Sequence, residues 1–123
     1  MSKLVIPGRL PGMNEYTRAC RSSRYAGADM KKEGERIVSA YIHKQLKGVK
    51  FDKPVSVYFY WYERNLRRDP DNISGFGRKV ILDALVRGGV LMDDSMAWVV
   101  YLGDYFFIDA KNPRIEVEIE EMI

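Results

Sequence analysis

Residues 54–62 constrain the fold more than any other stretch, because bulky side chains alternate there in two sets. One set is Val55, Val57, Phe59 and Trp61, and the other is Ser56, Tyr58, Tyr60 and Tyr62. Alternation with a period of two predicts a β-strand, and bulky residues on both faces predict a central strand or one covered on both sides. Residues 74–87 then predict a largely buried helix, because apolar side chains surround most of its circumference.

Three further strands follow from the same kind of pattern. Residues 3–6 predict a short strand, and residues 97–102 predict another, which residues 105–108 extend past an irregularity near Gly103-Asp104. Residues 114–120 alternate strictly between apolar and acidic side chains. The apolar set of this strand faces the core, and we expect its glutamates to line a solvated face or a sheet edge. These glutamates are Glu116, Glu118 and Glu120.

A first helix is predicted over residues 29–47, where apolar residues recur at spacings of three and four. Asp29 is suited to be its N-cap, and Gly48 follows its last turn. Residues 8–25 contain Gly and Pro without apolar periodicity, which predicts a mobile surface loop. The fold class is therefore α+β: one domain over residues 1–123, with a small mixed sheet of about four strands and two main helices packed on it.

Length and composition exclude several classes of protein. A chain of 123 residues with 46% hydrophobic and 30% charged residues is typical of one globular domain. It contains no apolar run near the roughly 20 residues of a membrane helix, and its first residues do not resemble a signal peptide. Cys20 is the only cysteine and His43 the only histidine, so we expect a reduced thiol and a structural or surface imidazole. Together these features predict a cytoplasmic protein with no membrane partner.

Positive charge is concentrated at the start of the chain. Residues 1–50 contain eleven Lys and Arg against four Asp and Glu, which gives +7, whereas the whole chain has +3. A basic N-terminal part of this kind suggests an anionic binding partner, and nucleic acid is the usual one. The residues that we expect to contact DNA here are Asn14, Tyr16, Arg18, Arg21 and Arg24. The alternative is a flexible basic loop whose tyrosines pack on the core.

The most informative polar motif is Arg67-Arg68-Asp69-Pro70-Asp71-Asn72, between the central strand and the second helix. In an extended segment Asp69 and Asp71 point to the same side, where a divalent cation would relieve their repulsion. Mg²⁺ prefers one or two carboxylates together with water and substrate phosphate. Pro70 holds Asp69 extended, Asn72 or Ser74 is suited to cap the helix, and the two arginines are suited to flanking phosphates or to the aspartates.

A second acidic pair, Asp93-Asp94, follows the helix at its far end. A helix of about 14 residues is about 21 Å long, so Asp94 reaches the first pair only if residues 88–94 return along the helix. Otherwise Asp94 would complete the site of a dimer partner. Each pair alone is also typical of turns and helix caps. An EF-hand starting at Asp69 is excluded, because Val80 stands where that loop needs a glutamate.

The ordered set Arg68-Asp69-Pro70-Asp71-Asn72, Lys79-Val80-Ile81-Leu82-Asp83-Ala84-Leu85, Gly89 and Asp93-Asp94 resembles the signature of the RusA family of Holliday junction resolvases. Residues 11–16 also resemble the Pro/Asn loop near the N-terminus of that family. The resemblance implies a small homodimeric, Mg²⁺-dependent endodeoxyribonuclease, with Mn²⁺ as a possible substitute, that resolves four-way DNA junctions by paired nicks in DNA recombination and repair. Members are found in bacterial cells and are often carried by phages and prophages.

Position by position, the resemblance implies that Asp69, Asp71 and Asp94 are catalytic metal ligands. It implies that Lys79 is the essential basic residue, which would neutralise charge in the transition state. Asp93 and Asp83 match acidic positions to which the resemblance gives no specific role, and we expect Asp93 to be a further metal ligand. The segment between Asp71 and Lys79 is longer here than the family pattern, so Arg78 is an alternative to Lys79. Two other functions remain open: a broader nuclease for flaps, forks or RNA, and a non-catalytic DNA-binding module.

Overall fold

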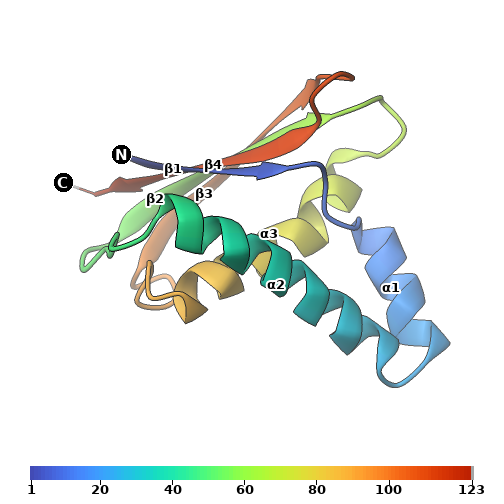
Figure 1. Cartoon of the computed structure of the whole chain (residues 1–123), viewed down its shortest axis with the longest axis horizontal. Coiled ribbons are helices and arrows are strands. Elements are labelled where there is room, and N and C mark those ends of the chain that lie inside the picture. The colour runs from blue at the N-terminus through green and yellow to red at the C-terminus, as the bar shows by residue number, and fades with distance from the viewer. Residues whose placement is uncertain (123) are drawn as a thin grey trace.

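A computed structural model describes residues 1–122 and contains one four-stranded mixed sheet in the order β1-β4-β2-β3 (Figure 1). The strands are β1 (Ser2–Pro7), β2 (Val55–Glu63), β3 (Val99–Ile108) and β4 (Arg114–Glu121). β4 is antiparallel to both β1 and β2, whereas β3 is parallel to β2. The predicted α+β class and the mixed sheet of four strands are confirmed.

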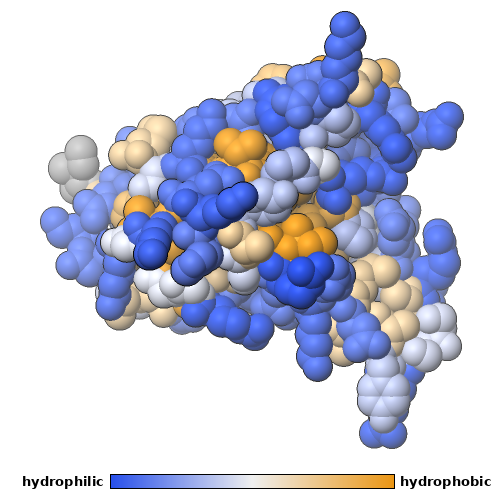
Figure 2. Space-filling model, viewed as in Figure 1, coloured by the Kyte–Doolittle hydropathy of each residue, from blue (hydrophilic) through white to orange (hydrophobic). Residues whose placement is uncertain are grey.

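Three helices lie on one side of this sheet: α1 (Met13–Ser22), α2 (Ala26–Gln45) and α3 (Pro70–Arg87) (Figure 1). The core lies between the sheet and the two longer helices, where α2 packs on β1 and α3 packs on β2. Its most deeply buried side chains include Leu4, Ile6, Val38, Val57, Phe59, Trp61, Val80, Ile81, Leu85, Ile115, Val117 and Ile119. Figure 2, in the view of Figure 1, shows a surface on which hydrophilic side chains predominate and hydrophobic atoms form small separate patches.

β2 is central, between β4 and β3, as its two bulky faces predict. Its helix-facing residues are buried, whereas Tyr58, Tyr60 and Tyr62 on the opposite face are half-buried. Those tyrosines are covered by neighbouring side chains of the same sheet, since Tyr60 stacks on Tyr105 at 5.2 Å between ring centroids. Within residues 1–122, no second layer of helices or strands covers this open face. The tyrosines of β2 are covered there only by aromatic side chains of the neighbouring strand β3.

The loop predicted for residues 8–25 is wrong over Met13–Ser22, which form α1. None of the α1 residues is fully buried, so the segment lacks the apolar stripe by which a helix is recognised in sequence. Tertiary contacts define it instead: the Tyr16 ring stacks on Phe76 of α3 at 4.6 Å, and Glu15 accepts a hydrogen bond from the backbone N–H of Gly12. α2 also begins earlier than predicted, with Tyr25 rather than Asp29 at its N-cap.

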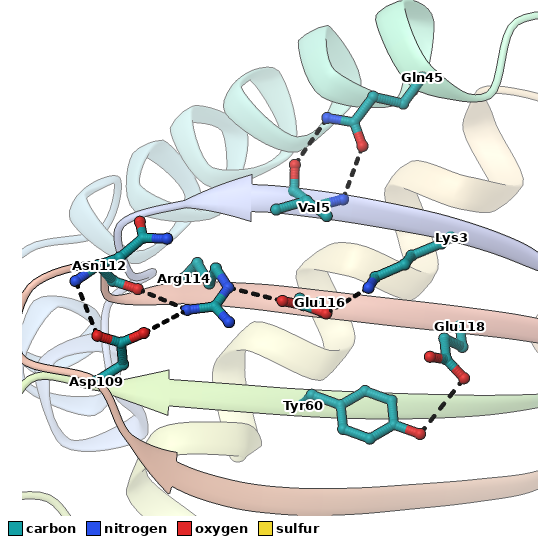
Figure 3. A network of polar contacts seen from close by, with 9 residues as sticks. All are labelled: Lys3, Val5, Gln45, Tyr60, Asp109, Asn112, Arg114, Glu116 and Glu118. Atoms are coloured by element: carbon teal, nitrogen blue, oxygen red, sulfur yellow. Dashed lines mark hydrogen bonds and ion pairs between the residues drawn. The ribbon is translucent and has the colours of Figure 1, made fainter.

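Two strand predictions need correction. β3 runs without a break through Gly103 and Asp104, and the register irregularity lies at its start, opposite Val55 and Ser56. β4 lies inside the sheet rather than at an edge, so the edge alternative for its glutamates is wrong. The solvated-face alternative is confirmed, because all three lie on the open face of the sheet. Two of them, Glu116 and Glu118, have bonding partners there. Glu116, for example, bonds both Lys3 at 2.7 Å and Arg114 at 2.6 Å on the open face (Figure 3).

Candidate active site

Asp69 and Asp71 lie at the start of α3, at the end of the molecule where β2 ends. Asp69 is the N-cap: its backbone is extended (φ −81°, ψ 165°), and its Oδ1 accepts a hydrogen bond from the Asn72 N–H at 2.9 Å. Pro70 occupies the first helical turn, where its missing N–H costs nothing. The extended geometry predicted for Asp69 is confirmed, but the prediction that Asn72 or Ser74 caps the helix is wrong, because Asp69 already does so.

Asp71 belongs to the first turn of α3 rather than to an extended segment. The prediction that a β-like spacing aligns the two carboxylates is therefore wrong, since the helix begins at Pro70 and not at Ser74. Both aspartates are nevertheless exposed at one helix N-terminus. The free N–H groups and the dipole of that end favour negative charge, and they also favour a bound phosphate.

A buried ion pair holds the segment in front of these acids. The Arg68 guanidinium donates to both oxygens of Glu63, with Nε–Oε1 at 2.9 Å and Nη2–Oε2 at 2.8 Å, and also donates to the Leu10 carbonyl at 3.2 Å. The side chains of Arg68 and Glu63 are only 10% and 8% exposed, so the guanidinium is not presented to a DNA phosphate. Arg67 is exposed, so its guanidinium is free to contact a DNA phosphate.

Sequence reasoning missed Glu63, although a signal exists. Glu63 occupies the position that the inward set of β2 would fill next after Phe59 and Trp61, so an acid there must face the core. A buried acid needs a cationic partner, and the nearest arginines follow within five residues. The pair ties the β2–α3 connection to the end of the central strand, and thereby fixes where α3 begins.

Lys79, Asp83 and Asp94 form a second cluster farther along α3. The Lys79 ammonium contacts Asp83 at 3.1 Å and Asp94 at 3.3 Å, and Asp83 also contacts Lys31 of α2 at 2.8 Å. Hydrogen bonds to Asp83 and then Asp94 raise the pKa of Lys79 above its ordinary value. Burial pushes the pKa of Asp83 upward, but the hydrogen bonds from Lys31 and Lys79 outweigh it, and the net pKa is lowered.

The two acidic pairs do not meet within one copy. Residues 88–98 turn back beside α3 as far as Lys79, which lies eight residues, or about 12 Å, along the helix from Asp71. No three His, Cys, Asp or Glu side chains in residues 1–122 lie close enough to hold a metal ion together. A single copy therefore presents Asp69 with Asp71 at one place and Asp93 with Asp94 at another.

Arg78 and Lys79 point to different surroundings. Arg78 contacts Asp104 of β3 at 3.1 Å and lies over the Phe59 ring at 5.8 Å, so it joins α3 to the sheet. Lys79 is 58% exposed and lies on the side that carries Asp94. Of the two, Lys79 is the one that shares a surface with a predicted site residue.

The predicted DNA contacts of residues 14–24 lie mostly along α1. Asn14, Thr17, Arg18 and Arg21 line a hollow of about 310 Å³, and Arg24 follows the helix as an exposed residue. The Asn14 N–H donates to Asn72 Oδ1 at 2.8 Å, so this basic surface begins beside the start of α3 (Figure 1). Tyr16 takes the packing alternative instead, because its ring lies against Phe76 and the core.

Paired carboxylates at a helix N-terminus are residues that could hold a divalent cation, and exposed arginines on the adjacent helix are residues that could contact phosphates. The family model Endodeoxyribonuclease RusA matches residues 11–120 of the 123 residues. The chain belongs to this family, and the resemblance drawn from its motifs is confirmed. A comparison with curated proteins finds no match. Within residues 1–122, no helix combines the length and apolar character needed to cross a membrane.

Proposed function

We propose that the chain is a Mg²⁺-dependent endonuclease that resolves four-way DNA junctions by paired nicks. The observation that carries this proposal is the exposed pair Asp69 and Asp71 at the N-terminus of α3, in a chain that belongs to the RusA endodeoxyribonuclease family. The pair lies beside the basic surface of α1, to which it is joined through Asn72 and Asn14. A phosphodiester held by that surface would pass the helix N-terminus.

Asp69 and Asp71 supply the carboxylate oxygens that Mg²⁺ prefers, and the ion leaves room for water and substrate phosphate. When bound, such an ion activates a water molecule and neutralises charge at the scissile phosphate. Mn²⁺ has the same oxygen preference and should replace it. The Asp69 oxygen that caps the helix is already oriented by the Asn72 N–H, so the residues of the chain place one carboxylate before any ion arrives.

The third carboxylate, Asp94, we place in the site of a second copy. One copy does not gather three acidic side chains, and the 88–98 segment ends its return beside Lys79. A homodimer would bring two such surfaces together around a two-fold axis, and paired nicks on opposed strands require two sites related by symmetry. Lys79, held beside Asp94, would then place its cation near the phosphate of that shared site.

We assign to the exposed cationic side chains near α1 the contacts with DNA phosphates other than the one that is cleaved. Arg18 and Arg21 are exposed on α1, Arg24 is exposed just after it, and Arg67 is exposed three residues before the start of α3. Cationic side chains at such positions set the register of a duplex arm without reading its sequence. Recombination and repair are the processes in which such a junction would be met.

Cleavage of a synthetic four-way junction with Mg²⁺, and with a chelator, tests the proposal. Wild type should cut only with the ion, and Asp71→Asn should bind the junction but not cut it, with Asp52→Asn as an exposed control that should cut normally. Flap and fork substrates run beside the junction separate a junction resolvase from a broader nuclease. Binding without cutting under every ionic condition would instead indicate a DNA-binding module.

A further inference from the structure

Asp83 of α3 is a partly buried acid that contacts lysines from two different helices. Its carboxylate lies 3.1 Å from the Lys79 ammonium of the same helix and 2.8 Å from the Lys31 ammonium of α2. The Asp83 side chain is 19% exposed, whereas those of Lys31 and Lys79 are 32% and 58% exposed. Asp83 is therefore the most enclosed of the three charged side chains, and it is not among the proposed metal ligands.

The contacts of Asp83 contribute little to the stability of the two helices. Side chains four residues apart stabilise a helix only weakly, and the order with lysine before the acid, as in Lys79 and Asp83, is the less favourable one. The contact with Lys31 links α2 to α3, but apolar side chains of both helices already hold them together in the common core. Stability alone therefore does not explain why an acid is partly buried at this position.

The exposed side chain of Lys79 needs contacts that hold it in one place, because the ordering of a lysine carries one of the largest entropic costs of any side chain. Its ammonium contacts Asp83 at 3.1 Å and Asp94 at 3.3 Å. Asp94, however, is a proposed metal ligand, and a hard divalent cation takes the oxygens of the carboxylates that it binds. When Asp94 serves as a ligand, Asp83 is the acid that still holds the ammonium.

The contact of Lys31 with Asp83 keeps positive charge available at Lys79. An acid paired with Lys79 alone would neutralise the charge that the transition state of phosphodiester cleavage requires. Lys31 instead contacts Oδ2 of Asp83, and Lys79 contacts Oδ1. The two lysines and the acid together therefore carry one net positive charge.

The ammonium of Lys79 faces an open space in which a phosphate group has room. Lys79, Asp83 and Asp94 line a surface hollow of about 370 Å³, together with Val86, Arg87 and Asp93. The contact with Asp83 holds the cation on the wall of this hollow that α3 forms.

We propose that Asp83 and Lys31 are positioning residues for Lys79 in the cleavage reaction. Asp83 fixes the Lys79 ammonium beside Asp94, and Lys31 anchors and neutralises Asp83, so that the charge of Lys79 remains available to the phosphate. The inference rests on the proposed function, because Lys79 acts there on a scissile phosphate. The contacts that hold Lys79 are nevertheless present in the free chain and are measurable without DNA.

Single-turnover cleavage of a four-way junction by Asp83→Asn, Lys79→Met and the double variant tests the inference. Asp83→Asn should lower the cleavage rate about 10-fold or more, because a displaced cation loses much of its effect on the reaction. In the Lys79→Met background the same substitution should cause no further loss, since its effect passes through Lys79. Junction binding should not weaken, because the substitution removes a negative charge. Effects that multiply in the double variant, or a wild-type rate for Asp83→Asn, would overturn the inference.

Glu116→Gln is the matched control for the loss of a paired acid. Glu116 of β4 is 13% exposed and also contacts two cations, Lys3 at 2.7 Å and Arg114 at 2.6 Å, but it lies on the open face of the sheet. Its variant should cut the junction at the wild-type rate under conditions in which it is folded. A loss of cleavage equal to that of Asp83→Asn would mean that reduced stability explains both, and would overturn the inference.

Substitutions of Lys31 separate the charge of Lys79 from its position, and they also test the inference if Asp83→Asn does not fold. Lys31→Met leaves Asp83 to neutralise Lys79, so the cleavage rate should fall at least about threefold, a small part of the loss expected for a whole cation. Lys31→Arg keeps the positive charge and should restore most of the wild-type rate. Cleavage that Lys31→Met leaves unchanged, or that arginine does not restore, would overturn the role of Lys31.

A measurement on the free chain distinguishes failure of this inference from failure of the proposed function. Nuclear magnetic resonance relaxation of the Lys79 Nζ group, whose signal is identified by its loss in Lys79→Met, reports the mobility of the ammonium. In wild type it should be less mobile than that of Lys44, an exposed lysine of α2, and it should become more mobile in Asp83→Asn. Equal mobility in wild type and Asp83→Asn would overturn this inference alone. A restrained ammonium in a chain that cuts no junction would overturn the proposed function and leave the contact with Asp83 intact.

Discussion

The guanidinium of Arg68 and the carboxylate of Glu63 form a bidentate ion pair at the end of β2. The two N–O distances are 2.9 and 2.8 Å. Arg68 directly precedes Asp69, the N-cap of α3. The ion pair therefore attaches Arg68, the neighbour of the candidate catalytic Asp69, to the buried end of the central strand β2. Arg68 therefore has a structural role, whereas Arg67, Asp69 and Asp71 of the same motif are exposed.

Replacement of Arg68 by alanine should destabilise the protein by about 3–5 kcal/mol, because it leaves the Glu63 carboxylate buried without a partner. Urea unfolding followed by circular dichroism measures the change. Arg67→Ala is the matched control: its side chain is exposed, and the free energy of unfolding should change by no more than about 0.5 kcal/mol. Equal effects of the two substitutions would contradict this account of the pair.

Two glycines of α3 should respond in opposite ways to alanine. A Cβ at Gly77 would lie 2.8 Å from the Cη2 atom of the buried Trp61 ring, so Gly77→Ala should destabilise by about 1–3 kcal/mol. A Cβ at Gly75 meets mainly the flexible Met13 side chain, and alanine favours the helix by up to about 1 kcal/mol. Gly75→Ala should therefore be neutral or stabilising in thermal unfolding, and a loss as large as that of Gly77→Ala would show that Met13 cannot move.

The elements with regular apolar spacing could be predicted from sequence, and the others could not. The alternation at Val55–Glu63 and Arg114–Glu121 predicts both strands, because burial on one face leaves a period of two in the sequence. α1 leaves no such period, since none of its residues is fully buried and its position depends on contacts with α2 and α3. The order of the strands, which places β4 inside the sheet, is likewise a property of long-range pairing.

The candidate site was predictable to the same extent. Asp69 and Asp71 are recognisable because Pro70 and the helix that follows fix their surroundings locally. The neighbour of Asp94 is Lys79, and that relationship depends on the path of residues 88–98 along α3, which no local pattern determines. The pairing of Arg68 with Glu63 rather than with the aspartates depends in turn on the strand face from which Glu63 points.

Acid should weaken the fold partly through Asp83. Its folded-state pKa is lowered by Lys31 and Lys79 despite burial, so the stability it contributes is complete above the pKa of an unfolded aspartate, about 4, and is lost as pH falls through the lower folded value. The free energy of unfolding should therefore fall below about pH 4. In Asp83→Asn that decline should be shallower than in wild type, and an unchanged decline would exclude the contribution of this carboxylate.

Substitution of Lys79 should mainly affect the cleavage rate, whereas substitution of Arg78 should mainly affect stability. Lys79 is exposed beside Asp94, so Lys79→Met should lower the cleavage rate by about 10²-fold or more while the free energy of unfolding changes by no more than about 1 kcal/mol. Arg78 joins Asp104 to α3, so Arg78→Met should mainly reduce stability. Single-turnover cleavage and urea unfolding of both variants measure the two effects, and the reverse pattern would assign the catalytic cation to Arg78.

The arginines of α1 should contribute affinity that depends on salt and not on sequence. Arg18 and Arg21 line the same exposed hollow, and each phosphate contact on duplex DNA contributes about 0.9 to the slope of log K against log salt. Arg18→Ala/Arg21→Ala should therefore lower the slope by about 2 and weaken binding of junctions of different sequence by the same factor. Lys44→Ala/Lys47→Ala removes the same charge near the far end of α2 and should leave the slope unchanged. An equal loss of slope in both double variants would mean that net charge, and not a surface on α1, attracts the DNA.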